Sequence, residues 1–211
     1  MTDTIKTKYA FANAIRVADY LVKLLAPHCD RIHLAGSLRR IRPDVKDIEI
    51  VCMPKKERKE GLLFEEQAEL ITSRDFTEAL ATITDIVVKG NVDGRQMQIR
   101  TNSKICPGIY LDLFMPRPDD YYRIYTIRTG SAEYSHHIIA GRWKANGWVG
   151  TDGGLRKESE CIEKSGKWLC IAKKPQLPPV WNSEMEFYAW LGLPYIDPQL
   201  REYRPTLNTA Q

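Results

Sequence analysis

The chain lacks the residue patterns that mark zinc sites, disulfide-rich folds and membrane proteins. Its five cysteines are odd in number and form no CxxC pair, and its four histidines have no zinc-ligand spacing. It has no signal peptide and no apolar run long enough to cross a membrane. We therefore expect reduced thiols in a cytoplasmic protein that is not secreted and has no membrane partner.

A strong excess of one charge, internal repeats and low-complexity segments are also missing. The 211 residues carry a formal net charge of +4, which is compatible with nucleic-acid binding but does not indicate it alone. Hydrophobic residues make up 43% of the chain, enough to bury a core in one domain or in two small ones.

The sequence does contain a small turn followed by an acidic strand. Gly36 and Ser37 precede two arginines, and such a turn can hold phosphate oxygens through backbone N–H groups and guanidinium side chains. Asp47 and Glu49 follow within an apolar run. Because successive side chains of a strand alternate between its faces, both carboxylates are expected on one face.

A third acid, Asp112, shows the same alternation between Leu111 and Leu113 on a second predicted strand. Three carboxylates brought together would repel one another, so the set makes sense chiefly with cations bound. Mg²⁺ or Mn²⁺ suits such oxygen ligands, and two ions can clamp the attacking and leaving oxygens of a phosphoryl transfer. Each motif alone is typical of an ordinary strand or turn, but the ordered set favours nucleotidyl transfer.

Four motifs, which follow one another along the chain, resemble those of the family X DNA polymerases of the nucleotidyltransferase superfamily. The Gly-Ser turn with the acid-x-acid strand looks like the superfamily signature, and residues 128–134 are similar to the Thr-Gly-Ser turn of these polymerases. Residues 83–90 resemble the strand and hairpin between the catalytic acids, and residues 191–202 resemble the tail of bacterial members. The resemblance covers residues 32–202 and implies a minimal form without the N-terminal lyase domain.

The resemblance implies roles for the matching residues. Asp47, Glu49 and Asp112 would be the catalytic acids and would hold two Mg²⁺ ions, for which Mn²⁺ can substitute; Asp112 would also help to activate a primer 3′-hydroxyl. Nucleotide contacts are implied at Gly36, Ser37, Arg40, Thr129, Gly130 and Ser131. The candidates for contact with DNA, or alternatively for plain surface charges, are Arg39, Arg142 and Lys144.

Three departures from the family pattern bear on specificity. Glu49 stands where these polymerases normally carry Asp, and Ala132 replaces a polar residue that follows the Thr-Gly-Ser turn. Ile127 and Arg128 occupy the positions of an aromatic pair that helps to exclude the ribose 2′-hydroxyl. Incorporation of ribonucleotides is therefore compatible with the sequence.

We expect an α+β fold in two parts, divided at the proline-rich segment 116–120. Residues 1–118 would form a nucleotidyltransferase palm, a mixed antiparallel sheet with helices on one face, and residues 119–211 a smaller α+β subdomain that binds nucleotide and DNA. Hydrophobic periodicity and turn signals predict the following elements. Helices are expected over residues 9–25, 64–70, 75–83, 132–145 and 183–191, strands over 32–35, 47–53, 86–89, 95–101 and 109–114, and an exposed loop over 55–60.

These observations lead to a monomeric polymerase of bacterial, viral or mobile-element origin that fills short gaps during DNA repair. Its partners would be gapped or primer-template DNA and dNTPs, or NTPs. Two alternatives stay open. One is a non-templated nucleotidyltransferase that acts on an RNA end, a protein or a small molecule, and the other is a non-catalytic nucleotide-binding module.

Overall fold

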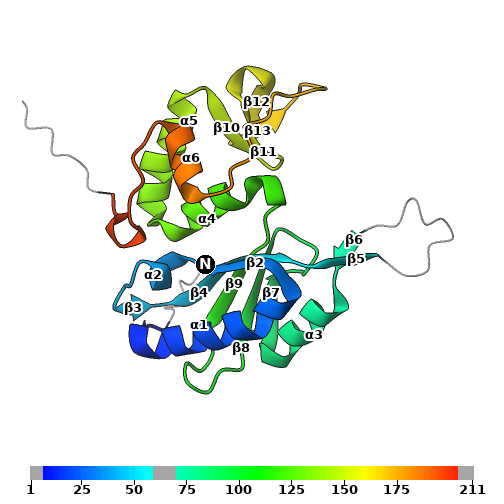
Figure 1. The fold of residues 1–211 in the computed structure, drawn as a ribbon, viewed down its shortest axis with the longest axis vertical. Helices are drawn as coiled ribbons and strands as arrows, with labels where there is room; N and C mark the ends of the chain where they lie inside the picture. The colour runs from blue at the N-terminus through cyan, green and yellow to red at the C-terminus, as the bar shows by residue number, and fades with distance from the viewer. Residues whose placement is uncertain (1–6, 59–69, 204–211) are drawn as a thin grey trace, which may run out of the picture. The chain divides into compact units, whose positions relative to one another are not determined.

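The computed structural model describes residues 7–58 and 70–203. The chain divides into two compact units, Met1–Pro118 and Asp119–Gln211, both of which combine helices with sheet (Figure 1). The fold is therefore mixed α+β. The division falls inside the proline-rich segment 116–120.

The first unit is built on a five-stranded mixed sheet in the order β2-β4-β9-β8-β7. Its strands β4 and β9 are parallel, and all other neighbouring pairs are antiparallel. The five strands are β2 (Cys29–Leu34), β4 (Asp47–Pro54), β7 (Thr84–Gly90), β8 (Gln96–Thr101) and β9 (Tyr110–Phe114). Two short ladders join β1 (Tyr9–Ala10) to β3 (Asp44–Val45) and β5 (Lys56–Arg58) to β6 (Leu70–Thr72).

Two helices, α1 (Phe11–Leu25) and α3 (Arg74–Ile83), cover the apolar face of this sheet (Figure 1). The buried side chains of α1 recur at three- and four-residue spacing and pack on the inward side chains of β4 and β9, such as Ile48 and Leu111. Ser73 begins α3 by accepting a hydrogen bond from the Phe76 N–H through its side chain. The opposite face of the sheet is left for the polar side chains of the same strands.

Most predicted elements of this unit are found, with two exceptions. The charged run 55–60 is not simply a loop, because Lys56–Arg58 form strand β5 against β6. Its three side chains are all exposed, so no alternation revealed it. The helix expected over residues 64–70 lies outside the described residues except at its end, where Leu70 belongs to strand β6.

The described residues of the second unit form several helical segments and a four-stranded sheet in the order β11-β10-β13-β12. The longer helical segments are α4 (Tyr121–Thr129), the π-helix η4 (Tyr134–Ala140), α5 (Gly141–Ala145) and α6 (Glu184–Leu191). The strands are β10 (Trp148–Thr151), β11 (Gly154–Lys157), β12 (Cys161–Lys164) and β13 (Lys167–Cys170). Short single-turn helices are η1 (Ala26–His28) and α2 (Gly36–Arg39) in the first unit, η3 (Pro118–Asp120) at the boundary, and η5 (Glu158–Glu160) and η6 (Pro198–Leu200) in the second unit.

An aromatic cluster forms the core of the second unit. The indole of Trp181 packs edge-on against Phe187 and Trp190, and Trp148 packs against Trp190 in the same way. The predicted helix 132–145 is helical, but its first half has π-helical geometry, and α4 was not predicted at all. Helix α6 begins with the predicted cap, in which Ser183 Oγ accepts from the Glu186 N–H over 3.1 Å.

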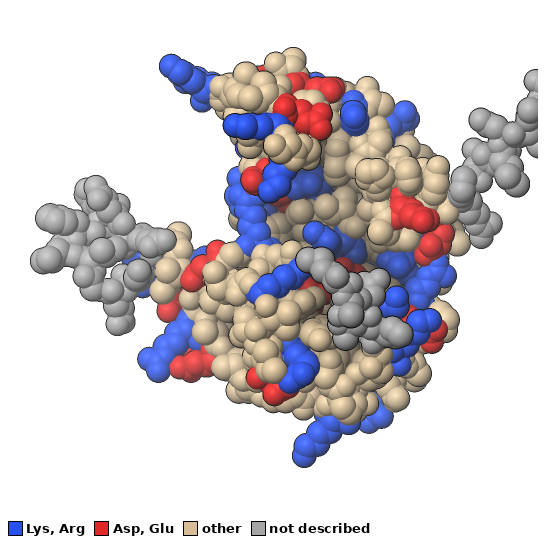
Figure 2. Space-filling view, turned by 180° about the vertical axis from the view of Figure 1, so that it is seen from behind, with Lys and Arg blue, Asp and Glu red and all other residues tan. Residues whose placement is uncertain are grey.

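None of the helices among the described residues has the length and apolar character needed to cross a membrane. All five cysteines carry free thiols. Lysine and arginine side chains are found on the surface of both units, interspersed with acidic ones (Figure 2).

Candidate active site

The backbone brings two of the three predicted catalytic acids side by side. Glu49 on β4 and Asp112 on β9 are direct register partners in the parallel pair. Register partners point to the same face of a sheet, and Asp47, two residues before Glu49, shares that face. The flanking residues Ile48 and Leu111 point to the opposite, apolar face and are fully buried. The alternation seen in the sequence therefore places all three acids on one face of neighbouring strands.

The Gly-Ser segment lies directly against this acidic face. The Ala35 N–H donates to the Glu49 carbonyl over 2.9 Å, which fixes the end of β2 beside β4. Gly36 then begins α2 with φ at +61°, and a Cβ at this position would overlap with the carboxylate of Glu49. Only glycine combines this left-handed backbone with so close an approach. The turn and the acidic strand are thus one local structure.

Gln98 is a member of this face that the sequence did not single out. It is the register partner of Asp112 on β8, and its side-chain Nε2 donates to Asp112 Oδ1 over 2.8 Å. Asp112 is 8% exposed. This hydrogen bond orients the Asp112 carboxylate on the acidic face. A glutamine in an alternating strand has no motif signal, so only the strand pairing reveals it.

The donor set has the chemistry of a Mg²⁺ or Mn²⁺ site, since carboxylate oxygens on neighbouring strands are what such ions bind. The side chains do not converge in the conformation described, however. Among residues 7–58 and 70–203, no group of three or more His, Cys, Asp or Glu side chains is arranged to hold a metal ion. The shared face of Asp47, Glu49 and Asp112 fits the cations, and metal binding there stays a prediction.

The remaining predicted residues of the first unit lie on α2 or directly after it, next to the acidic face. Ser37 and Arg39 are half-buried, and the Ser37 carbonyl accepts from the Arg42 N–H over 3.0 Å. Arg40 follows the last residue of α2, and its N–H donates to the carbonyl of Gly36 over 3.2 Å. The tight turn therefore holds two guanidinium-bearing residues within one turn of Gly36.

The predicted Thr-Gly-Ser turn belongs to the second unit, where its hydroxyl groups make hydrogen bonds to the backbone of the same unit. Thr129 is fully buried, and its hydroxyl donates to the Tyr125 carbonyl over 2.7 Å. Gly130 ends α4, and Ser131 Oγ accepts from the Tyr134 N–H over 3.1 Å. The hydroxyl of Thr129 is thus occupied by a hydrogen bond within α4. Ser131 is the only one of the three residues that is partly exposed.

The two cationic candidates that follow this turn differ in their surroundings. Arg142 donates from Nε to the Leu191 carbonyl over 3.0 Å and from Nη2 to the Gly192 carbonyl over 3.1 Å. Its guanidinium therefore caps the C-terminal end of α6, a structural role. Lys144 is exposed on α5.

A buried ion pair, absent from the predicted site, ties the C-terminal segment to this region. Arg201 is fully buried, and its Nη1 donates to Glu184 Oε1 over 2.8 Å. Thr126 on α4 donates to the same oxygen over 3.1 Å, and the Arg201 carbonyl accepts from the Ser131 N–H over 3.3 Å. Although burial alone would lower it, the pKa of Arg201 is raised because of the hydrogen bond and charge of Glu184. The tail thereby holds α4, α6 and the Thr-Gly-Ser turn together.

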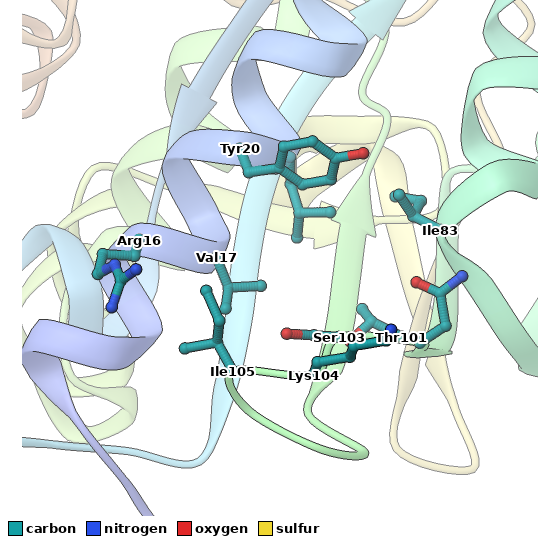
Figure 3. A pocket seen from close by; sticks show the side chains of 10 residues that line it. Arg16, Val17, Tyr20, Ile83, Thr101, Ser103, Lys104 and Ile105 are labelled. Carbon is teal, nitrogen blue, oxygen red and sulfur yellow. The ribbon is translucent and has the colours of Figure 1, made fainter.

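A cavity of about 360 Å³ lies beside helix α1, which covers the apolar face of the sheet (Figure 3). Val17, Tyr20 and Leu21 of α1 line it together with Ile83 and the segment after β8 that includes Lys104. Because its lining is mainly apolar and contains none of the three acids, this cavity is separate from the candidate active site.

Comparison with known proteins adds no assignment. No model of a known protein family matches the chain, and no curated protein matches it.

Proposed function

We propose that this protein is a nucleotidyltransferase that adds nucleotides to the 3′-hydroxyl of a DNA primer. The observation that carries the proposal is the pairing of Glu49 with Asp112 in adjacent parallel strands, with Asp47 on the same face. This arrangement offers two or three carboxylates to divalent cations, while the Gly36 turn lies against one of them.

In the proposed reaction Asp47, Glu49 and Asp112 would hold divalent cations, whose chemistry would be to polarise the phosphate and the attacking hydroxyl. Asp112, oriented by Gln98, lies beside the primer end and receives the proton of the 3′-hydroxyl. The backbone of residues 36–37 and the guanidinium of Arg40 contact the triphosphate oxygens. Bond formation between the primer oxygen and the α-phosphorus accompanies release of pyrophosphate.

The second unit would contribute the nucleotide and DNA contacts. Ser131 and Lys144 are its partly or fully exposed polar candidates. Affinity that rests on such scattered phosphate contacts falls steeply with salt, so we expect distributive addition of one or a few nucleotides.

The test is a primer-extension assay with the full chain, Mg²⁺ or Mn²⁺, and gapped, template-primer or single-stranded DNA. Extension that follows the template base on gapped DNA is the expected result. Addition that ignores the template would support a non-templated transferase instead. Metal-dependent nucleotide binding without addition to any of these substrates would contradict the proposal and would favour a binding module or a transferase with an acceptor other than DNA. Parallel reactions with dNTPs and NTPs report the sugar preference.

A further inference from the structure

Two of the cysteines lie opposite each other in a hairpin of the second unit. Cys161 on β12 and Cys170 on β13 are register partners in an antiparallel pair. Ser165 and Gly166 connect the strands, both with positive φ, at 52° and 74°. Two such residues form the short turn that matches the twist of a hairpin and fixes its register.

The hydrogen-bond pattern identifies the kind of pair these cysteines form. The Ile171 N–H donates to the Glu160 carbonyl over 3.0 Å, one position beyond the two cysteines. Cys161 and Cys170 therefore occupy a non-hydrogen-bonded position, where paired Cα atoms are about 4.5 Å apart and side chains are closest. A disulfide requires Cα atoms roughly 4.4–6.8 Å apart.

Exposure separates this pair from the other cysteines. Cys161 and Cys170 are partly exposed, whereas Cys29, Cys52 and Cys106 are buried. Cys29 and Cys52 lie on the paired strands β2 and β4, but their register partners are Pro54 and Ile32 rather than each other. Only the hairpin pair combines direct cross-strand register with access from solvent.

We propose that Cys161 and Cys170 are an oxidation site that forms a reversible cross-strand disulfide by exchange with a low-molecular-weight disulfide such as oxidised glutathione. One cysteine thiolate attacks the small disulfide, forms a mixed disulfide and releases one small thiolate. The other cysteine thiolate then attacks the protein sulfur of that mixed disulfide and releases the second. The cysteine pair loses two electrons and two protons, and the small disulfide is reduced to two thiols.

The crosslink would stabilise a hairpin that is weak by its own composition. Strand β12 lies at the edge of its sheet. Lys164 and Lys167, which flank the turn, are direct cross-strand partners, and like charges in this position destabilise a hairpin. Burial raises the pKa of the Cys161 thiol, and the neighbouring thiol of Cys170 raises it further. Exchange should therefore become faster as the pH rises, because the thiolate is the attacking species.

The experiment incubates the full chain with mixtures of reduced and oxidised glutathione, blocks free thiols by alkylation and maps the peptides by mass spectrometry. We expect a crosslinked peptide pair joining Cys161 to Cys170, lighter by two hydrogen atoms and lost on treatment with dithiothreitol. Cys161→Ser and Cys170→Ser should each abolish it, and Cys106→Ser should leave it unchanged.

A second readout is backbone hydrogen exchange of the oxidised and reduced protein. Oxidation should slow exchange at Ile162 and Leu169, the pair adjacent to the crosslink, and leave strand β4 unaffected. The proposal is overturned if fully oxidised glutathione yields no crosslink, stable mixed disulfides at both positions, or a crosslink between Cys29 and Cys52 alone.

Discussion

The backbone of Gly36 lies against the carboxylate of Glu49, so closely that even a methyl group at Gly36 would overlap with it. The φ of +61° at Gly36 adds a second constraint, because side-chain-bearing residues are strained in this region. The first residue of the Gly-Ser turn and the second acid of the strand are thus mutually dependent.

Gly36→Ala should therefore lower both stability and activity. The left-handed backbone alone costs about 1–2 kcal/mol in the free energy of unfolding, and displacement of the Glu49 side chain should weaken metal-dependent activity further. Urea unfolding and primer extension measure the two effects. Gly150→Ala is the control, since nothing lies within 4 Å of a Cβ there and its φ is not positive. Equal stability of the two variants would contradict the constraint.

Gln98→Leu should weaken metal use by releasing Asp112 Oδ1 from its 2.8 Å hydrogen bond. Groups that orient a metal ligand typically contribute about 10–100-fold to metal affinity or activity. We expect a higher Mg²⁺ concentration at half-maximal extension, with the KM for dNTP little changed. Gln96→Leu, two residues earlier on the same strand, is the matched control. If both variants show the same Mg²⁺ dependence as the original chain, Gln98 has no positioning role.

Arg201→Met should strongly destabilise the second unit. It leaves Glu184, which is only 6% exposed, without its cationic partner, and breaking a buried pair in this way costs about 3–5 kcal/mol. The double variant Arg201→Met with Glu184→Gln removes the stranded charge and keeps the acceptor for Thr126. It should therefore unfold at a higher urea concentration than Arg201→Met alone. A double variant less stable than the single one would refute this account of the pair.

Acid should weaken the contact between Asp93 and β6. The Thr72 N–H donates to Asp93 Oδ1 over 2.6 Å and lowers the pKa of this carboxyl group. A folded-state pKa below the ordinary value of about 3.9 means that the stabilisation is complete above that pH and is lost as the pH falls through the folded-state pKa. Urea unfolding at pH 7 and near pH 3 should show a smaller acid loss for Asp93→Asn than for the original chain. Identical losses would argue against the contact.

Periodicity predicted the parts of the fold in which one face is apolar. Helix α1 and strands β4, β8 and β9 each bury one side against a common core, so their patterns were visible in the sequence. Helix α4 escaped prediction because its buried residues include Arg123, Thr126 and Thr129 along with tyrosines, which leaves no apolar stripe. Strand β5 escaped because all its side chains are charged or polar and exposed.

The sequence predicted the individual residues of the candidate site, but not how these residues are placed relative to one another. Alternation put Asp47 and Glu49 on one face, yet the register that pairs Glu49 with Asp112 depends on how two distant strands pack on the shared core. The same holds for Gln98 and for the Arg201 pair, whose importance comes from tertiary contacts alone. A local sequence pattern does not indicate contacts between segments that are distant in the chain.

The most direct test of the proposed function is the rate of single-nucleotide incorporation into gapped DNA by the original chain and by Asp112→Asn. The control Asp19→Asn removes an exposed carboxylate of α1, which packs on the opposite face of the sheet. The account predicts Mg²⁺- or Mn²⁺-dependent incorporation that Asp112→Asn reduces by about two orders of magnitude or more and Asp19→Asn leaves unchanged. Incorporation that survives Asp112→Asn, or that is absent from the original chain with either metal, would contradict it.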